Sequence, residues 1–220
     1  MSYNNAVLTI TQSDAPDPFV VAVDLLSQAE HGPDSPAVLI STSEALATEV
    51  IKTVERLLVD MPTRDFAGPA WRDHGQVFVV DSLDAAYRLA DEFASEHVQV
   101  LTERPREALE RLHNYGALFL GEQTCVAYGD KVIGTNHTLP TRLTSRYTGG
   151  LWVGKYLKTV TYQEITNPQS SVDLGRLCAR ASRVEQFEGH ARSGDIRAAK
   201  YAGDPLPWAW DQYPNTVALD

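Results

Sequence analysis

Cysteine and positive charge are the two scarce features of this sequence. Its 220 residues include only two cysteines, Cys125 and Cys178, which are too far apart to form a Cys-x-x-Cys pair and too few for a disulfide framework. Lysine and arginine number 19 against 29 aspartates and glutamates, which leaves a formal net charge of -10. A protein that binds nucleic acid needs a basic surface, so we expect no nucleic-acid partner.

Membrane-directing segments are also missing. The start of the chain, residues 1–5, has no basic region followed by an apolar core, so no secretion signal is indicated. No apolar run approaches the length that spans a membrane. Hydrophobic residues make up 43% and charged residues 22%, which is ordinary for a globular protein. We therefore expect a cytoplasmic protein with no membrane partner, built as one large domain or as one domain with an appendage.

Apolar runs alternate with helical patterns over the first 120 residues. Strands are expected at residues 6–11, 37–40, 77–80, 98–101 and 117–120, and helices at 19–30, 43–58, 83–94 and 105–114. The segment 62–73 has no clear pattern and is expected to be irregular. This alternation predicts an α/β fold with a mainly parallel, incomplete Rossmann-like sheet and helices on both faces.

The pattern changes after about residue 150. Two helical runs are expected, one from Ser170 or Ser171 to residue 181 and one from residue 184 to residue 200. A proline-rich tail, residues 203–220, is expected to be extended. We therefore predict an α/β domain at 1–150 that carries the chemical groups, and at 151–220 a C-terminal helical appendage with the tail.

A polar, glycine-bounded loop is expected at residues 129–141, and it contains Asp130 and His137. It follows the predicted strand at 117–120, and open α/β sheets bind ligands beyond the ends of their strands. Taken alone, this loop is more often explained by an aspartate that caps a turn and a solvated histidine.

Four histidines have a carboxylate or amide close by in the sequence. The pairs are Gln28 with His31, Glu96 with His97, Asp130 with His137, and Glu185 with His190. A glutamine, an aspartate and two histidines can supply nitrogen and oxygen ligands to a divalent metal. Two adjacent titratable groups suit acid–base chemistry. Each pair taken alone is better explained by capping or by solvated polar residues, and spacing does not show that the four pairs meet.

Four stretches of the sequence resemble the second half of histidinol dehydrogenase. They are DLLSQAEHGPDS at 24–35, ASEH at 94–97, GD at 129–130 with GTNHTLPT at 134–141, and Glu185 with His190. The resemblance runs from about Ala6 to beyond His190. That family acts in histidine biosynthesis, and it oxidises the alcohol histidinol through an aldehyde to histidine with zinc and two NAD in succession. The resemblance implies an oxidoreductase for a small amino alcohol or a related alcohol.

The resemblance also implies a metal site shared by two subunits. The residues that match the zinc ligands are Gln28, His31, Asp130 and His190. In the family the last of these comes from the other subunit of a dimer. We therefore expect a homodimer that binds Zn²⁺, or another divalent metal, with His190 contributed across the interface.

The same resemblance implies roles for the remaining pairs. His97 matches the base that takes the alcohol proton, and Glu96 matches the residue that activates water in the second oxidation. His137 and Glu185 match contacts to the substrate. A neighbouring imidazole that deprotonates a metal-polarised alcohol is consistent with this assignment.

The sequence departs from the family in two respects. The family's chain is about twice as long, and its first half supplies the nucleotide-binding domain. Here no Gly-x-Gly-x-x-Gly follows a strand, and the first expected turn carries Asp14 and Asp17, which repel a pyrophosphate. The residues around Asp130, at 125–128 and 131–133, also differ from the family's usual types. Family-level NAD use is thus implied without its binding half, and we expect this chain alone not to bind NAD tightly.

Three functions remain open on this sequence. One is a zinc-dependent, NAD-linked alcohol dehydrogenase of the histidinol dehydrogenase type, with or without a separate nucleotide-binding chain. Another is a half-length metalloenzyme with non-redox chemistry such as hydrolysis, hydration or cyclisation. The last is a non-catalytic partner subunit. Glu96 beside His97 argues against the last, because a binding module has no need of an acid–base pair.

Overall fold

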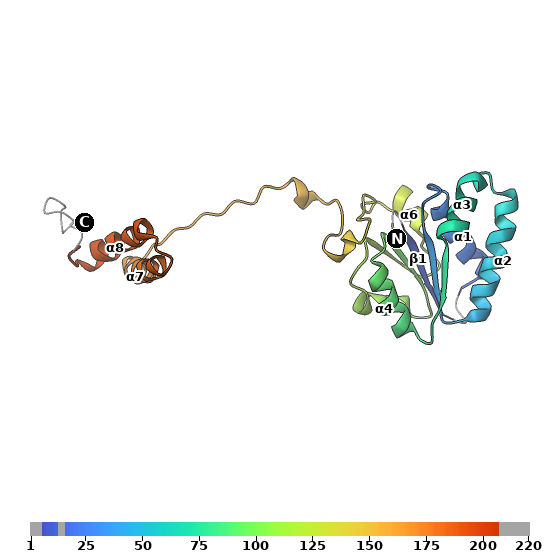
Figure 1. Cartoon of the computed structure of the whole chain (residues 1–220), viewed down its shortest axis with the longest axis horizontal. Coiled ribbons are helices and arrows are strands. Elements are labelled where there is room, and N and C mark those ends of the chain that lie inside the picture. Colours follow the sequence, from blue (N-terminus) through green and yellow to red (C-terminus); the bar gives the residue numbers. More distant parts are fainter. Residues whose placement is uncertain (1–5, 13–15, 207–220) are drawn as a thin grey trace. The chain divides into compact units, whose positions relative to one another are not determined.

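The structure is a computed structural model that describes residues 6–12 and 16–206. The chain divides into two compact units, residues 1–157 and residues 158–220, and each is described by itself (Figure 1).

The first unit contains a five-stranded sheet in which every neighbouring pair of strands is parallel. Its strands are β1 (Val7–Thr11), β2 (Ala37–Ser41), β3 (Gln76–Val79), β4 (His97–Leu101) and β5 (Ala117–Leu120). Their order is β3-β2-β1-β4-β5, so the chain crosses from one half of the sheet to the other between β3 and β4. The predicted parallel α/β fold is confirmed, because the short apolar runs are the strands of a sheet that is covered on both faces.

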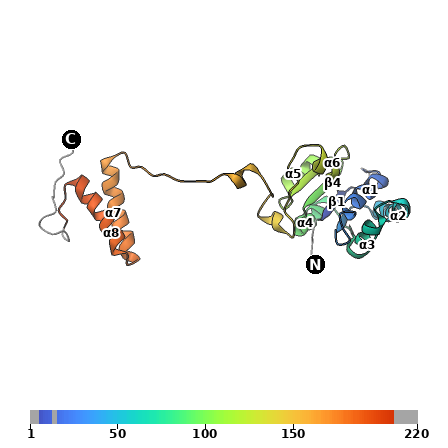
Figure 2. The same ribbon diagram turned by 90° about the horizontal axis from the view of Figure 1, so that it is seen from above.

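Among the described residues of this unit, six α-helices cover the two faces of the sheet. They are α1 (Pro18–Ala29), α2 (Glu44–Asp60), α3 (Arg64–His74), α4 (Leu83–Phe93), α5 (Ala108–Arg111) and α6 (Val126–Lys131). Residues of α1, α2, α3 and α6 pack on one face, and residues of α4 and α5 pack on the other. Figure 2 shows α1, α2 and α3 on one side of the strands and α4 on the other.

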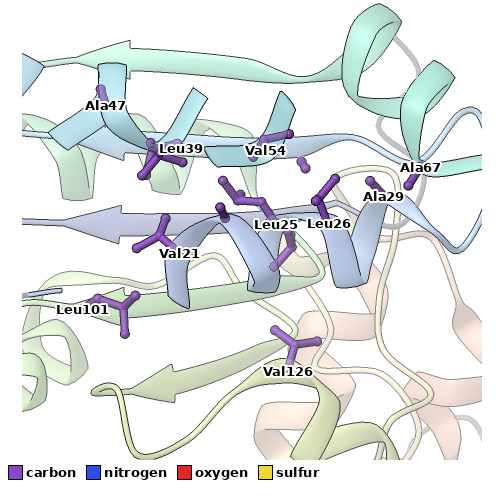
Figure 3. Packing of buried hydrophobic residues seen from close by; sticks show 14 of the residues in the cluster. Val21, Leu25, Leu26, Ala29, Leu39, Ala47, Val54, Ala67, Leu101 and Val126 are labelled. Carbon is purple, nitrogen blue, oxygen red and sulfur yellow. The ribbon is translucent and has the colours of Figure 1, made fainter. Parts of the chain in front are cut away.

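Helix α1 is central to the first of these two cores. Its residues Val21, Leu25 and Leu26 point towards the sheet and are buried, and they pack with Leu39 of β2 and Val54 of α2 (Figure 3). Asp17 begins the helix by accepting a hydrogen bond from the Phe19 backbone N–H at 2.8 Å. Because α1 follows β1 and precedes the parallel strand β2, it runs antiparallel to the strands and ends at their amino edge.

Two helices lie where the sequence predicted irregular chain. Helix α3 occupies most of 62–73, a segment that Gly68 and Pro69 made a poor helix candidate. It forms because Ala67 and Ala70 are fully buried against the core, and this packing outweighs the poor propensity. The predicted loop at 129–141 likewise begins in α6, which includes residues 129–131.

The second unit is a helical hairpin of α7 (Pro168–Val184) and α8 (Glu188–Ala202). Both expected helical runs are present, but the second begins at Glu188 and not at residue 184, because a turn that includes Gln186 at φ 63° separates the two helices. The helices cross closely at two glycines. A Cβ on Gly175 would lie 2.6 Å from the Gly194 carbonyl oxygen, and a Cβ on Gly194 would lie 2.5 Å from that of Gly175.

Two further expectations concern the end of the chain and membranes. The predicted tail at 203–220 falls largely outside the described residues, which end at 206. Among the helices that the structure describes, none has the length and apolar character needed to cross a membrane.

The glycine crossing gives a stability prediction. Gly175→Ala should lower the free energy of unfolding of the hairpin by about 1–3 kcal/mol, because the new methyl group meets backbone that cannot move independently. Gly189→Ala is the matched control, since nothing lies within 4 Å of a Cβ at that position of α8. Denaturant unfolding of both variants, followed by far-UV circular dichroism, tests this; equal stabilities would show that the crossing is loose.

Candidate active site

The candidate site of the first unit lies at the amino edge of the sheet. His97 is the first residue of β4, and it pairs in register with Val7 and Ala117, the first residues of β1 and β5. The expectation that the loop with Asp130 lies beyond the carboxyl ends of the strands is wrong. Helix α6 carries the chain back across the sheet after β5, so Asp130 reaches His97 at the opposite edge.

The His97 ring lies between two carboxylates. Its Nδ1 is 3.8 Å from Glu96 Oε2 and its Nε2 is 3.8 Å from Asp130 Oδ1, and the three side chains are only 5%, 11% and 14% exposed. Both distances exceed hydrogen-bond range. Within the described part of the chain, neither ring nitrogen has a hydrogen-bond partner, and the same holds for Glu96 Oε2. Buried polar atoms left in this state are suited to a bound ligand or water.

Burial shifts the pKa values of the adjacent residues Glu96 and His97. It raises the pKa of Glu96 to about 7, and the negative charge of Asp130 adds to the rise. Burial also holds the pKa of His97 well below its usual range, and His31 lowers it further while Asp130 opposes both effects. At neutral pH the imidazole is therefore uncharged and able to accept a proton, and Glu96 is close to its midpoint. Such perturbed groups are typical of functional sites.

Gln28 and His31 come to the same edge from α1. Gln28 lies in the last turn of the helix and is 1% exposed. His31 lies two residues past the helix end, and its backbone N–H donates to the Gln28 carbonyl at 3.1 Å. His31 is near enough to His97 for its charge to lower the pKa of the His97 imidazole.

One segment that sequence reasoning overlooked contacts the end of α4 just before Glu96. The Ser145 hydroxyl donates to the Ala94 carbonyl at 2.6 Å, and the Arg146 guanidinium donates to the Glu92 carbonyl at 2.8 Å. Gly116 closes the other side, because a Cβ there would lie 2.5 Å from the Glu96 carbonyl oxygen. A serine and a glycine in loops gave no sequence signal for this role.

A second overlooked feature is a buried polar contact behind His97. Gln99 of β4 is fully buried and donates from Nε2 to Asp24 Oδ2 of α1 at 2.7 Å. Burial raises the pKa of Asp24, the Gln99 hydrogen bond lowers it, and Glu122 raises it. A glutamine inside the apolar run of β4 was the available signal, since it shares the strand face of His97.

The other predicted residues are distributed as follows. His137 is exposed and lies between α6 and residue 140. Glu185 directly follows α7 and His190 lies in α8, so both belong to the second unit, where both are exposed. The ring of His190 is 5.5 Å from that of Phe187.

The predicted metal set can be tested against this geometry. In residues 6–12 and 16–206, no group of three or more histidine, cysteine, aspartate and glutamate side chains is arranged to hold a metal ion. The first unit contributes His31, Asp130 and the Gln28 amide, which are one nitrogen and two oxygen donors. These donors are of the types that bind zinc, and a fourth ligand would come from another part of the protein. The unpartnered polar atoms of His97 and Glu96 remain available to a bound substrate or water.

Nearly the whole chain is similar to proteins of one family. The family model for histidinol dehydrogenase matches residues 6–198. A histidinol dehydrogenase homolog of Aspergillus oryzae, oryD, is 58% identical over 194 residues, which cover 87% of this chain and 81% of that protein. The sulfopropanediol 3-dehydrogenase of Ruegeria pomeroyi is 45% identical over 86% of this chain and 43% of its own length.

A solved structure shows the same fold. The crystal structure of histidinol dehydrogenase from Elizabethkingia anophelis superposes with a TM-score of 0.82 at 30% identity, and the match covers 88% of this chain and 44% of that one. The chain therefore spans about half the length of most of the relatives named here and four-fifths of the Aspergillus protein.

The shifted pKa of Glu96 predicts a pH-dependent stability. A carboxyl with pKa 4.5 in the unfolded chain and about 7 in the fold favours folding fully below pH 4.5, and its contribution is lost as pH rises through 7. In metal-free protein, Glu96→Gln should therefore become more stable relative to wild type between about pH 5 and 7.5, by an amount on the order of 1–2 kcal/mol.

Urea unfolding at several pH values measures this difference. Glu92→Gln is a suitable control, because Glu92 is an exposed glutamate in the last turn of α4, four residues before Glu96. The shifted pKa would be contradicted if the difference in free energy of unfolding between wild type and Glu96→Gln did not vary with pH.

Proposed function

The chain belongs to the histidinol dehydrogenase family, and from that premise we propose that it is a metal-dependent oxidoreductase for a small alcohol, an amino alcohol or a related one. The observation that carries the proposal is the buried Glu96–His97–Asp130 cluster at the amino edge of the sheet. The relative named sulfopropanediol 3-dehydrogenase supports the wider choice of alcohol.

His97 acts as the base in this proposal. Its imidazole is neutral at physiological pH and carries unpartnered nitrogens, so it can accept the proton of an alcohol hydroxyl held beside it. Glu96, with a pKa of about 7, can accept a proton from water in a second oxidation of an aldehyde to an acid. His137 and Glu185 would contact the substrate.

The metal ligands would be Gln28, His31 and Asp130 of one subunit and His190 of the other. A divalent ion such as zinc, when bound there, would polarise the alcohol oxygen and lower the pKa of its hydroxyl. Asp130 then has a second effect, because its carboxylate beside Nε2 favours the imidazolium that forms when His97 takes the proton.

NAD fits this chain less well than the metal does. A dinucleotide needs free backbone N–H groups at a helix N-terminus that follows a strand. The corresponding end of α1 is occupied by Asp17, whose own carboxylate accepts from Phe19 N–H. We therefore assign no step to NAD on the described residues, and a redox reaction would need a partner chain or another nucleotide site.

The same observation favours a second candidate function, a half-length metalloenzyme that carries out hydrolysis, hydration or cyclisation with the same acid–base pair. Calorimetric titration with NAD, with and without L-histidinol, bears on this choice: micromolar binding would favour the dehydrogenase and would contradict the expectation that this chain alone does not bind NAD tightly.

The metal proposal predicts about one zinc ion per chain in protein purified without chelator. His31→Ala and His190→Ala should each lower the zinc content strongly, because each removes one of four ligands. His113→Ala is the matched control, since that exposed histidine pairs with Asp91 on the far side of β4. Elemental analysis measures the content, and wild-type protein without stoichiometric metal would refute the proposal.

A shared site also predicts complementation in a homodimer. Chains carrying His97→Ala and chains carrying His190→Ala should each be inactive, and a mixture should regain part of the activity because one hybrid site keeps both residues. Light scattering fixes the oligomeric state. A monomer that still binds one zinc would contradict the shared site.

A further inference from the structure

We infer that Gln99 is a positioning residue that holds the three chain segments of the candidate site in register, through one amide nitrogen. Its role in positioning presupposes the function proposed above, whereas the tie between the segments stands on geometry alone. The segments are α1, which brings Gln28 and His31; β4, which begins at His97; and the chain leading into α6, which brings Asp130.

The two contacts of Gln99 Nε2 reach both neighbours of β4. It donates to Asp24 Oδ2 on α1 at 2.7 Å and to the Thr124 backbone carbonyl, just before α6, at 3.5 Å. The short contact to a carboxylate is a charge-assisted hydrogen bond, which is stronger than one between neutral groups. One side chain on β4 thus connects to both of the other segments.

The residue spacing along α1 and β4 shows how the Asp24–Gln99 contact aligns the helix with the strand. From Asp24 to Gln28 the helix advances four residues, about 6 Å towards the amino edge of the sheet. From Gln99 back to His97 the strand covers two residues, about 6.6 Å in the same direction. Because the two advances nearly match, an Asp24–Gln99 contact places Gln28 level with His97.

A purely structural role would not require a glutamine here. Both faces of β4 are buried, and an apolar side chain would avoid the desolvation of an amide. Gln99 Oε1 is buried with no hydrogen-bond partner in the described part of the chain, which is a further cost. Neighbouring Thr9, in register with Gln99 on β1, has a hydroxyl in the same condition. Because the buried amide of Gln99 carries this cost, we interpret the residue as one that positions its neighbours and not as one that only fills the core.

Three variants of the full chain separate the two contacts. Gln99→Met keeps the length and removes both. Gln99→Glu replaces the donor with an acceptor facing Asp24. The double variant Asp24→Asn/Gln99→Glu reverses the α1 hydrogen bond, since the asparagine amide now donates, but it leaves a carboxylate opposite the Thr124 carbonyl.

Two readouts are compared on ¹⁵N-labelled protein: the backbone amide resonances of Gln28 and Asp130, and the dissociation constant for Zn²⁺ alone. Gln99→Met should shift both resonances and weaken zinc binding about 10-fold, as changes behind metal ligands commonly do. The double variant should restore the Gln28 resonance and not that of Asp130, and should recover part of the zinc affinity.

Val54→Ala is the control for lost stability, because Val54 is fully buried in the same core on α2, which carries none of the site residues. Gln99→Met behaving like Val54→Ala in both readouts would overturn the inference, as would a double variant that restores neither resonance. If wild-type protein binds no zinc, the proposed function fails, and the two resonances still decide whether the tie exists.

Discussion

Burial of a histidine between two carboxylates is the interaction on which the site of this protein depends. His97 occupies the first position of the strand next to the centre of the sheet, and Glu96 and Asp130 lie on either side of its ring. Low polarizability of the surroundings makes both unpaired charge and unpaired polar atoms costly. This cost arises where α1, the start of β4 and α6 meet. Burial of the apolar clusters on both faces of the sheet offsets it.

The parallel sheet explains why the site is at an edge that sequence reasoning did not favour. In a doubly wound sheet each helix returns the chain to the amino edge, so the ends of α1 and α6 meet the start of β4 there. The carboxyl edge, where such sheets commonly bind nucleotides, carries Asp17 as the cap of α1. The geometry therefore separates the acid–base cluster from the usual nucleotide position.

Sequence patterns predicted the strands well because each is a short apolar run, and they predicted the long helices well because capping residues such as Ser43 and Ser82 start them. They failed at α3, where burial of two alanines outweighs Gly68 and Pro69. They also failed at α6, which is only six residues long. Family resemblance, and not spacing, brought Glu96, His97 and Asp130 into one site, since contacts between segments 30 or more residues apart leave no local signal. Gln99 was missed for the same reason, because its partner Asp24 is 75 residues away.

The position of His97 at the very start of β4 ties chemistry to strand register. Side chains alternate between the two faces of a strand, so a slip of one residue would turn His97 towards the core of α4 and α5 and bring Val98 beneath α1. Ala94, in the left-handed conformation at φ 46°, and the two residues after it form the short link from α4 into this strand. The pairing register of β4 is thus a chemical parameter of the protein: the same ladder that aligns His97 with Val7 and Ala117 also decides that an imidazole, and not a valine, faces α1 at the start of the strand.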